Sequence, residues 1–136
     1  MSGKCLSIFG YENTDEKMKG LRDLFINAST LYAYRLNSGE KASNDYATAK
    51  CSGSRGNDLK VIISKDADDT TKFVVDLYLG TVKVDSQTVT SAAELVENDF
   101  VTYKSTAILT TTAGTPLTGG TNGTVNGASY QDYFDK

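Results

Sequence analysis

The stretch Phe73-Val-Val-Asp-Leu-Tyr-Leu79 decides the fold class of this chain, because its hydrophobicity repeats with the period of a β-strand. One face of the predicted strand is wholly apolar and consists of Phe73, Val75, Leu77 and Leu79. The other face mixes charged, apolar and aromatic residues and consists of Lys72, Val74, Asp76 and Tyr78. Since successive side chains of a strand point to opposite faces, this pattern predicts a strand with one buried face.

Turn signals on both sides of this stretch predict antiparallel neighbours for it. The acidic turn 66–69 leads back to the segment 59–63, in which every second residue is apolar. A Gly-Thr turn at 80–81 leads forward to the segment 82–85. Strands joined by such short turns pair as hairpins, so we expect at least three strands side by side.

Further segments extend this β-rich region to about residue 113. Short strands are predicted at 46–51, 100–103 and 107–111. A capping-box pattern, Ser91-Ala-Ala-Glu94, predicts one short helix at about 91–97. Several short strands separated by turn signals are typical of a small antiparallel β-barrel or sandwich, which we assign to residues 44–113.

The first part of the chain predicts a β-α-β unit. Residues 5–9 form a short apolar run that fits a strand. Thr14 can cap the helix that follows, in which apolar residues recur at three- and four-residue steps. Residues 30–36 predict a second strand, apolar on both faces and therefore typical of a parallel or mixed sheet. Residues 1–43 are thus predicted to be the strand-helix-strand edge of an α/β core, and the predicted fold class of the whole chain is α+β.

The last part of the chain predicts a return to this core. Residues 114–127 form a long loop rich in Gly, Thr and Asn, and Ser129 can cap a helix that runs to the end of the sequence. We therefore assign residues 114–136 to a return loop and the start of a core helix. Because a β-α-β unit with two strands cannot bury both of its faces alone, we expect the sequence to be a piece of a larger protein.

The composition argues against several classes of function. The 136 residues carry a net charge of -3 and no stripe of Lys and Arg interleaved with aromatics, so no nucleic-acid partner is expected. No membrane insertion is expected, since no apolar run approaches the roughly 18 residues of a spanning helix. The chain has no His, and its two cysteines, Cys5 and Cys51, are too few for a zinc site and are interpreted as small buried hydrophobic residues. We predict no catalytic residue, no cofactor and no metal, and therefore no enzyme.

Two glycine-rich loops are the candidate sites of the chain. The first carries Gly53, Arg55, Gly56 and Asn57, and the second carries Gly119, Gly120 and Gly123. Neither matches the phosphate-binding patterns G-x-x-x-x-G-K-[ST] or G-x-G-x-x-G between a strand and a helix. We interpret both as structural turns that need a positive φ, and the second, within 114–127, as a candidate hinge between two domains.

Four segments, in this order, resemble one known family. Cys5-Leu-Ser-Ile-Phe-Gly-Tyr11, with a helix that ends in Leu-Arg-Asp-Leu-Phe25, resembles the family's K-I-F-G-Y and L-R-D-L-F. Leu31-Tyr-Ala-Tyr-Arg-Leu-Asn37 is similar to its next strand. Ala47-Thr-Ala-Lys-Cys-Ser-Gly-Ser-Arg-Gly-Asn-Asp-Leu59 resembles A-x-Y-x-G-x-R-G-N-D-I, and Pro116-Leu-Thr-Gly-Gly-Thr-Asn-Gly-Thr124 resembles L-x-G-G-x-D/N-G. On these motifs the chain is identified as a member of the contractile tail sheath family, of the kind found in PBSX-type phage-like elements.

The resemblance implies an α/β core with an inserted β-rich domain and terminal arms that join neighbouring subunits. It implies that the parent protein polymerises with other copies around a tail tube, meets a baseplate and contracts. Assembly is then expected in the cytoplasm of the bacterial host, followed by a place in a released virion or phage-tail-like particle. An infectious phage, a defective prophage and an R-type bacteriocin all fit. Since both arms and most of the core's far half are absent, this piece alone is expected to be monomeric.

Two other classes of function fit the residues. A β-rich domain with exposed Tyr and Thr would suit a surface module that binds glycans, and tight binding on a glycan array would favour that function. The chain could also be an accessory domain of an enzyme whose catalytic residues lie elsewhere. A long flanking reading frame with His, Asp and Ser motifs would favour the enzyme.

Overall fold

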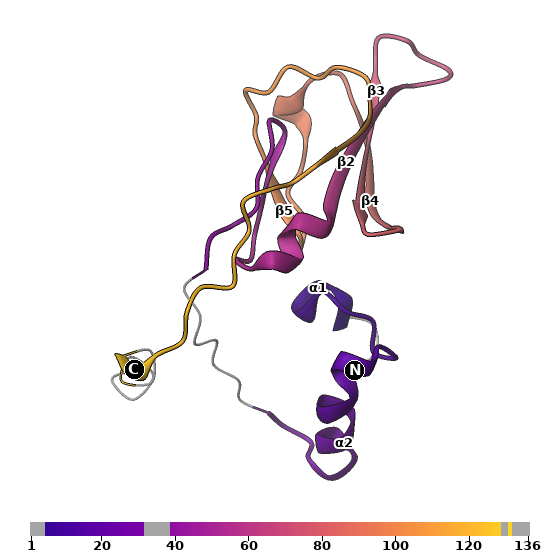
Figure 1. Ribbon diagram of the computed structural model, residues 1–136. Coiled ribbons are helices and arrows are strands. Elements are labelled where there is room, and N and C mark those ends of the chain that lie inside the picture. The colour runs from indigo at the N-terminus through magenta and orange to yellow at the C-terminus, as the bar shows by residue number, and fades with distance from the viewer. Residues whose placement is uncertain (1–4, 32–38, 129–130, 132–136) are drawn as a thin grey trace. The chain divides into compact units, whose positions relative to one another are not determined.

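The computed structural model describes residues 5–31, 39–128 and 131 (Figure 1). The chain divides into two units, one formed by residues 1–36 with 125–136 and the other by residues 37–124. We call the first the helical unit and the second the β unit. None of the helices within the described ranges has the length and apolar character to cross a bilayer.

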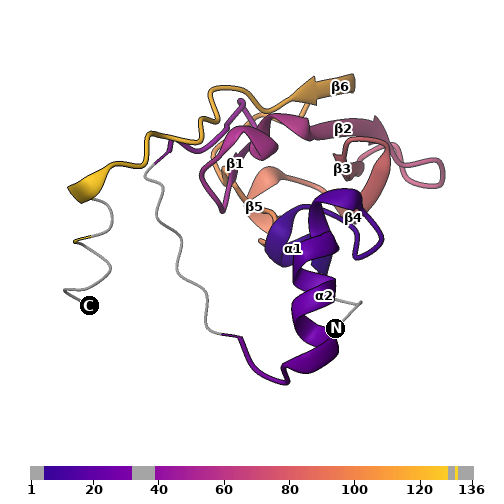
Figure 2. The same ribbon diagram turned by 60° about the horizontal axis from the view of Figure 1, so that its bottom comes forward.

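A four-stranded antiparallel sheet in the order β4-β3-β2-β6 forms one layer of the β unit (Figure 2). Its strands are β2 (Leu59–Lys65), β3 (Phe73–Leu79), β4 (Val82–Val89) and β6 (Thr112–Pro116). β2 and β3 pair without a break, from Leu59 opposite Leu79 to Lys65 opposite Phe73. The strand predicted at 73–79 and its two hairpins are confirmed.

A second, two-stranded sheet completes the β unit. It pairs β1 (Ala47–Ala49) with β5 (Val101–Tyr103) in antiparallel register. Both sheets contribute buried apolar side chains, among them Val61, Ile63, Val75 and Leu77 from the larger sheet and Ala47, Ala49, Val101 and Tyr103 from the smaller. The predicted α+β fold class with a small antiparallel β-sandwich is therefore confirmed.

Two short elements of the β unit differ from the prediction. The strand predicted at 107–111 is wrong, because the edge of β2 is paired by β6, which begins only at Thr112. Ile108 is 83% exposed, so its apolar character does not mark a buried strand position. The loop predicted over 114–127 consequently starts later, since its first residues belong to β6.

The short helix predicted at 91–97 is a single 3-10 turn, η4 (Ala92–Glu94). The side chain of Ser91 does not cap it. Instead, the carboxylate of Glu94 accepts a hydrogen bond of 2.8 Å from the amide of Thr90 and one of 2.6 Å from its hydroxyl. Ser91 holds the N-cap position as the pattern predicted, but Glu94 reaches back to the residue before it, so the reciprocal bonds of a capping box are not formed.

The helical unit begins with a helix where the sequence predicted a strand. α1 spans Cys5–Phe9, and the amide of Gly10 donates to the carbonyl of Leu6 over 2.8 Å, as in a helical turn. The strand at 5–9 is therefore wrong, and so is the first strand of the predicted β-α-β unit. An apolar run of five residues has no period that separates a strand from a buried helix, which explains the error.

The next predicted helix is confirmed, with a later start. It consists of η2 (Glu16–Met18) followed by α2 (Lys19–Asn27). Asp15 caps it in place of Thr14, because the Asp15 carboxylate accepts a hydrogen bond from the Lys17 amide. The strand predicted at 30–36 and the helix predicted from Ser129 fall, apart from residues 30, 31 and 131, outside the described residues.

Candidate functional site at the junction of the β unit

The first glycine-rich turn lies between β1 and β2. Gly53 has a φ of 128°, and a 3-10 helix, η3 (Ser54–Asp58), follows it. Within η3 the guanidinium of Arg55 pairs with the carboxylate of Asp58. Gly56 needs its small size rather than an unusual φ, since a Cβ there would lie 2.9 Å from the Cβ of Ala42. The positive φ that the sequence predicted is thus present at Gly53.

The second glycine-rich turn follows β6. Gly119 has a φ of 84° and Gly123 a φ of 67°, values that favour glycine. Gly120 lies between them and is buried. A Cβ at Gly120 would lie 2.5 Å from the carbonyl oxygen of Gly53, so this position also requires glycine. The two turns therefore touch, although more than sixty residues separate them.

Asn57 joins the two turns by binding both polar groups of one peptide residue. Its side-chain nitrogen donates to the carbonyl of Gly120 over 2.9 Å, and its side-chain oxygen accepts from the amide of Gly120 over 2.8 Å. A second bond lies beside this pair, because the amide of Ser54 donates to the side-chain oxygen of Asn122 over 2.9 Å. Hydrogen bonds of the Asn57 and Asn122 side chains thus hold the two loops together, as backbone hydrogen bonds hold two strands.

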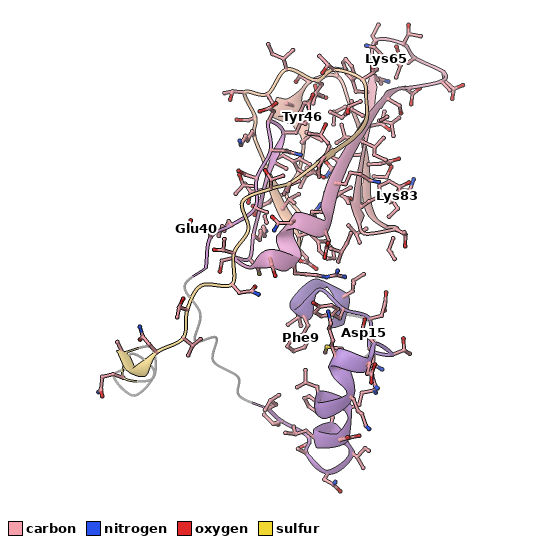
Figure 3. The ribbon with its side chains drawn as sticks, viewed as in Figure 1. Phe9, Asp15, Glu40, Tyr46, Lys65 and Lys83 are labelled. Carbon is pink, nitrogen blue, oxygen red and sulfur yellow. The ribbon has the colours of Figure 1, made fainter. Side chains whose placement is uncertain are left out.

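The chain segments that lead into and out of the β unit lie next to each other at the same place. Ser43 and Thr118 exchange both backbone hydrogen bonds, of 2.8 and 3.0 Å. Nearer the chain ends, Glu40 accepts at its carbonyl from the amides of Gly53 and Thr121, over 3.0 and 3.1 Å. The amide of Glu40 in turn donates to the hydroxyl of Thr121 over 2.9 Å. Figure 3 shows Glu40 on the incoming segment, beside the outgoing chain.

We call residues 39–43, 53–57 and 117–122 together the clasp. It brings together Gly53, Gly56, Asn57, Gly119 and Gly120, which the sequence had singled out, while Gly123 follows directly after it. Sequence reasoning missed Glu40, Ser54, Thr121 and Asn122. These residues carry no local signal, since they act through partners far away in the sequence.

A polar network fixes the segment after η4 to the edge strand β4. The side-chain amide of Gln87 donates to the carbonyl of Val96 over 2.8 Å and accepts from its amide over 2.9 Å. Asp85 accepts from Asn98 over 2.7 Å and lies 3.4 Å from the hydroxyl of Tyr103. Burial, and then the charge of Asp85, raise the pKa of Tyr103, so the phenol stays neutral and can donate to the carboxylate.

The acidic turn and Cys51 do not form a metal site within the residues that the structure describes. In the acidic turn after β2, the carboxylate of Asp66 accepts from the amides of Asp68 and Asp69, as in an ordinary turn. Across the described part of the chain, no cluster of three His, Cys, Asp or Glu residues could hold a metal ion. Cys51 is exposed, so its interpretation as a buried residue is wrong; it lies in the bend after β1 rather than in the strand.

Residues 37–122, which make up nearly all of the β unit, match the family described as the phage tail sheath protein beta-sandwich domain. This chain belongs to the phage tail sheath family. The matched range begins two residues before the clasp and ends at Asn122, the last residue of the clasp. In this sheath chain the clasp therefore joins the two ends of the family domain.

Curated relatives of this sheath chain occur in Bacillus subtilis strain 168. The phage-like element PBSX protein XkdK is 38% identical over 115 residues, which are 81% of this chain and 24% of XkdK. Protein YqbK of the same strain is 38% identical over 124 residues, which are 88% of this chain and 26% of YqbK. The sheath chain therefore spans about a quarter of the length of these relatives.

Two solved structures share its fold. A sheath tail protein from Desulfitobacterium hafniense is 37% identical with a TM-score of 0.87, covering 98% of this chain and 34% of that protein. A sheath tail protein from Listeria innocua is 32% identical with a TM-score of 0.85, covering 99% of this chain and 32% of that protein. The predicted resemblance to tail sheath proteins, including the PBSX type, is thus confirmed.

Proposed function

We propose that this chain is part of the structural subunit of a contractile tail sheath. The match of residues 37–122 to the sheath β-sandwich family carries this proposal. The TM-score of 0.87 to a protein described as a sheath tail protein supports it. The longer protein would polymerise with other copies into a helix around the tail tube and would meet a baseplate at one end.

In this function the work comes from subunit contacts and not from bond cleavage. The sheath would assemble in a strained extended packing, and a trigger at the baseplate would release it to a contracted packing of lower free energy. Such a switch needs two packings of similar subunits, as in other bistable assemblies. Assembly would take place in the host cytoplasm, and the particle would be a phage, a defective prophage or an R-type bacteriocin. The contracting sheath would drive the tube through a target cell envelope, and no residue of this chain is assigned a catalytic role.

The edges of the larger sheet support a chain that is monomeric on its own. On the β4 side the register shifts between Leu77 and Tyr78, and Lys83 lies at this bulge with 49% of its side chain exposed. On the β6 side the pairing with β2 shifts as well, and the strand ends at Pro116. Bulges, charged residues and proline at an edge all oppose the addition of further strands.

The exposed apolar side chains of the helical unit support a larger parent protein. Ile8 and Ile26 are 62% and 76% exposed, and Phe9 is 39% exposed. In the complete sheath subunit, we expect the rest of the core to cover these side chains, because exposed apolar clusters mark surfaces that pack against other protein.

A comparison of solution size tests the proposal. We expect light scattering to give the mass of one 14.6 kDa chain for this piece, and a far larger assembly for the longer sheath protein that contains it. Self-association of this piece into long polymers would contradict the prediction that polymerisation needs the longer protein. So would a longer protein that stays monomeric at every salt and protein concentration.

A further inference from the structure

The clasp restrains Gly120, which lies within the stretch 114–127 that composition had suggested as a hinge. Gly120 is buried, is bonded through both backbone groups to Asn57, and leaves no room for a Cβ beside Gly53. Rotation of the chain at Gly120 would break both bonds to Asn57 and open the contact with Gly53. Gly120 is therefore held in place, although it lies in a segment whose composition suggests flexibility.

The surroundings of the chain change after Asn122. Residues 121–128 are exposed, and Gly123 has a φ of 67°. At Gly127 an added Cβ would meet no atom within 4 Å outside its own helical turn, in contrast to Gly120, where it would lie 2.5 Å from the carbonyl oxygen of Gly53. The side chain of Asn122 accepts hydrogen bonds from the amide and the hydroxyl of Ser54 and so joins the outgoing segment to the turn 53–57.

Asn57 has the size and the two polar groups that this closure needs. Its amide offers one donor and one acceptor at a distance that fits the carbonyl and amide of a single residue, Gly120. Asp would keep the acceptor but would set a carboxylate oxygen against the Gly120 carbonyl. Ala would leave both backbone groups of Gly120 without this partner.

We propose that the clasp makes residues 39–122 one rigid body and places the outgoing pivot at residues 123–125. Asn57 is the positioning residue of this device. The proposal rests on the proposed function for its meaning in the sheath, where the β unit would then turn as a whole about this short segment. Its physical content concerns this chain alone and is measurable without any assembly.

Backbone relaxation by NMR on the 136-residue chain tests where rigidity ends. We expect order parameters of about 0.85 at Gly120 and Thr121, equal to those of the sheet, and below about 0.6 at Val125. Low order parameters at Gly120 and Thr121 would overturn the proposal, because the clasp would then be open. High values throughout residues 123–125 would overturn it too, because no pivot would lie there.

Hydrogen exchange on matched variants tests what closes the clasp. In Asn57→Ala and Asn57→Asp we expect the amides of Gly120 and Thr121 to exchange about tenfold faster or more, with Val75 unchanged. Gly120→Ala should act in the same direction, and Gly127→Ala, which meets empty space, should change nothing. Equal acceleration at Val75 in both Asn57 variants would overturn the proposal, since Asn57 would then stabilise the whole unit.

The two proposals fail in different ways. A longer sheath protein that never forms tubes would contradict the function and leave the exchange data of this chain untouched. An open clasp would contradict the rigid body and leave the capacity to assemble untouched.

Discussion

Single side chains of the β unit differ widely in burial, and their contributions to stability should follow. Leu77 lies in β3 with an exposure of 0%, between the two sheets, whereas Ile108 is an equally apolar residue with an exposure of 83%. Removing a buried side chain loses its transfer free energy and leaves a cavity, whereas removing an exposed one does neither. The two positions therefore form a matched pair.

We expect Leu77→Ala to lower the free energy of unfolding by about 2–5 kcal/mol. Ile108→Ala should change it by no more than about 0.5 kcal/mol. Urea unfolding followed by circular dichroism measures both values. Similar losses at the two positions would show that Ile108 is buried in solution and that the β unit is packed differently.

The stability of the turn at Glu94 should depend on pH. Hydrogen bonds from the hydroxyl and then the amide of Thr90 lower the pKa of Glu94 from its ordinary value of 4.5. Because the folded state has the lower pKa, the stabilisation is present above pH 4.5 and is lost as the pH falls through the lowered value.

An NMR titration of the Glu94 side chain should therefore show a midpoint below 4.5. In Thr90→Val the hydroxyl donor is gone while the shape is kept, so we expect the midpoint to move up toward 4.5. A midpoint at or above 4.5 in the unchanged protein would mean that Thr90 does not donate these hydrogen bonds to Glu94.

At the scale of elements, the sequence predicts what is local and long enough to show a period. The seven residues of β3 alternate cleanly, so this strand could be predicted with its bounds, whereas its partners β2 and β4 start as predicted and run on beyond the predicted ends at 63 and 85. The five-residue segments 5–9 and 107–111 are too short for that test, and the strands predicted there are absent from the structure. Such short runs take the structure that their neighbours impose.

Within the segment after η4, Val96 is held to the edge strand by the side chain of Gln87. Gln87 makes two hydrogen bonds to the backbone of Val96, and Val96 itself is 67% exposed and adds little burial. We expect Gln87→Ala to raise the exchange rate of the Val96 amide by about tenfold, because that amide loses its acceptor.

The neighbouring variant Thr88→Ala is the control, since Thr88 is exposed on the same strand. It should leave the exchange of Val96 unchanged. Slow exchange of Val96 in both variants would show that another contact holds this segment.

At the scale of the whole molecule, the sequence predicted both candidate turns but not their meeting. Each turn carries its own glycine signal, whereas the pairing of Asn57 with Gly120 joins positions far apart in the chain and has no local pattern. The family resemblance included both turns as motifs, but it did not indicate that they contact each other. The assignment of the helical unit to a larger core stays a prediction, as does the absence of catalysis.

The central claim is that this chain belongs to the building block of a sheath, and electron microscopy of the longer protein that contains it tests that claim most directly. We predict hollow tubes with a regular helical repeat and a bore that fits a tail tube. In their density, residues 39–122 should appear as one body with the fold of the β unit. Single soluble particles under every condition tried, with no tube or sheet, would contradict the claim.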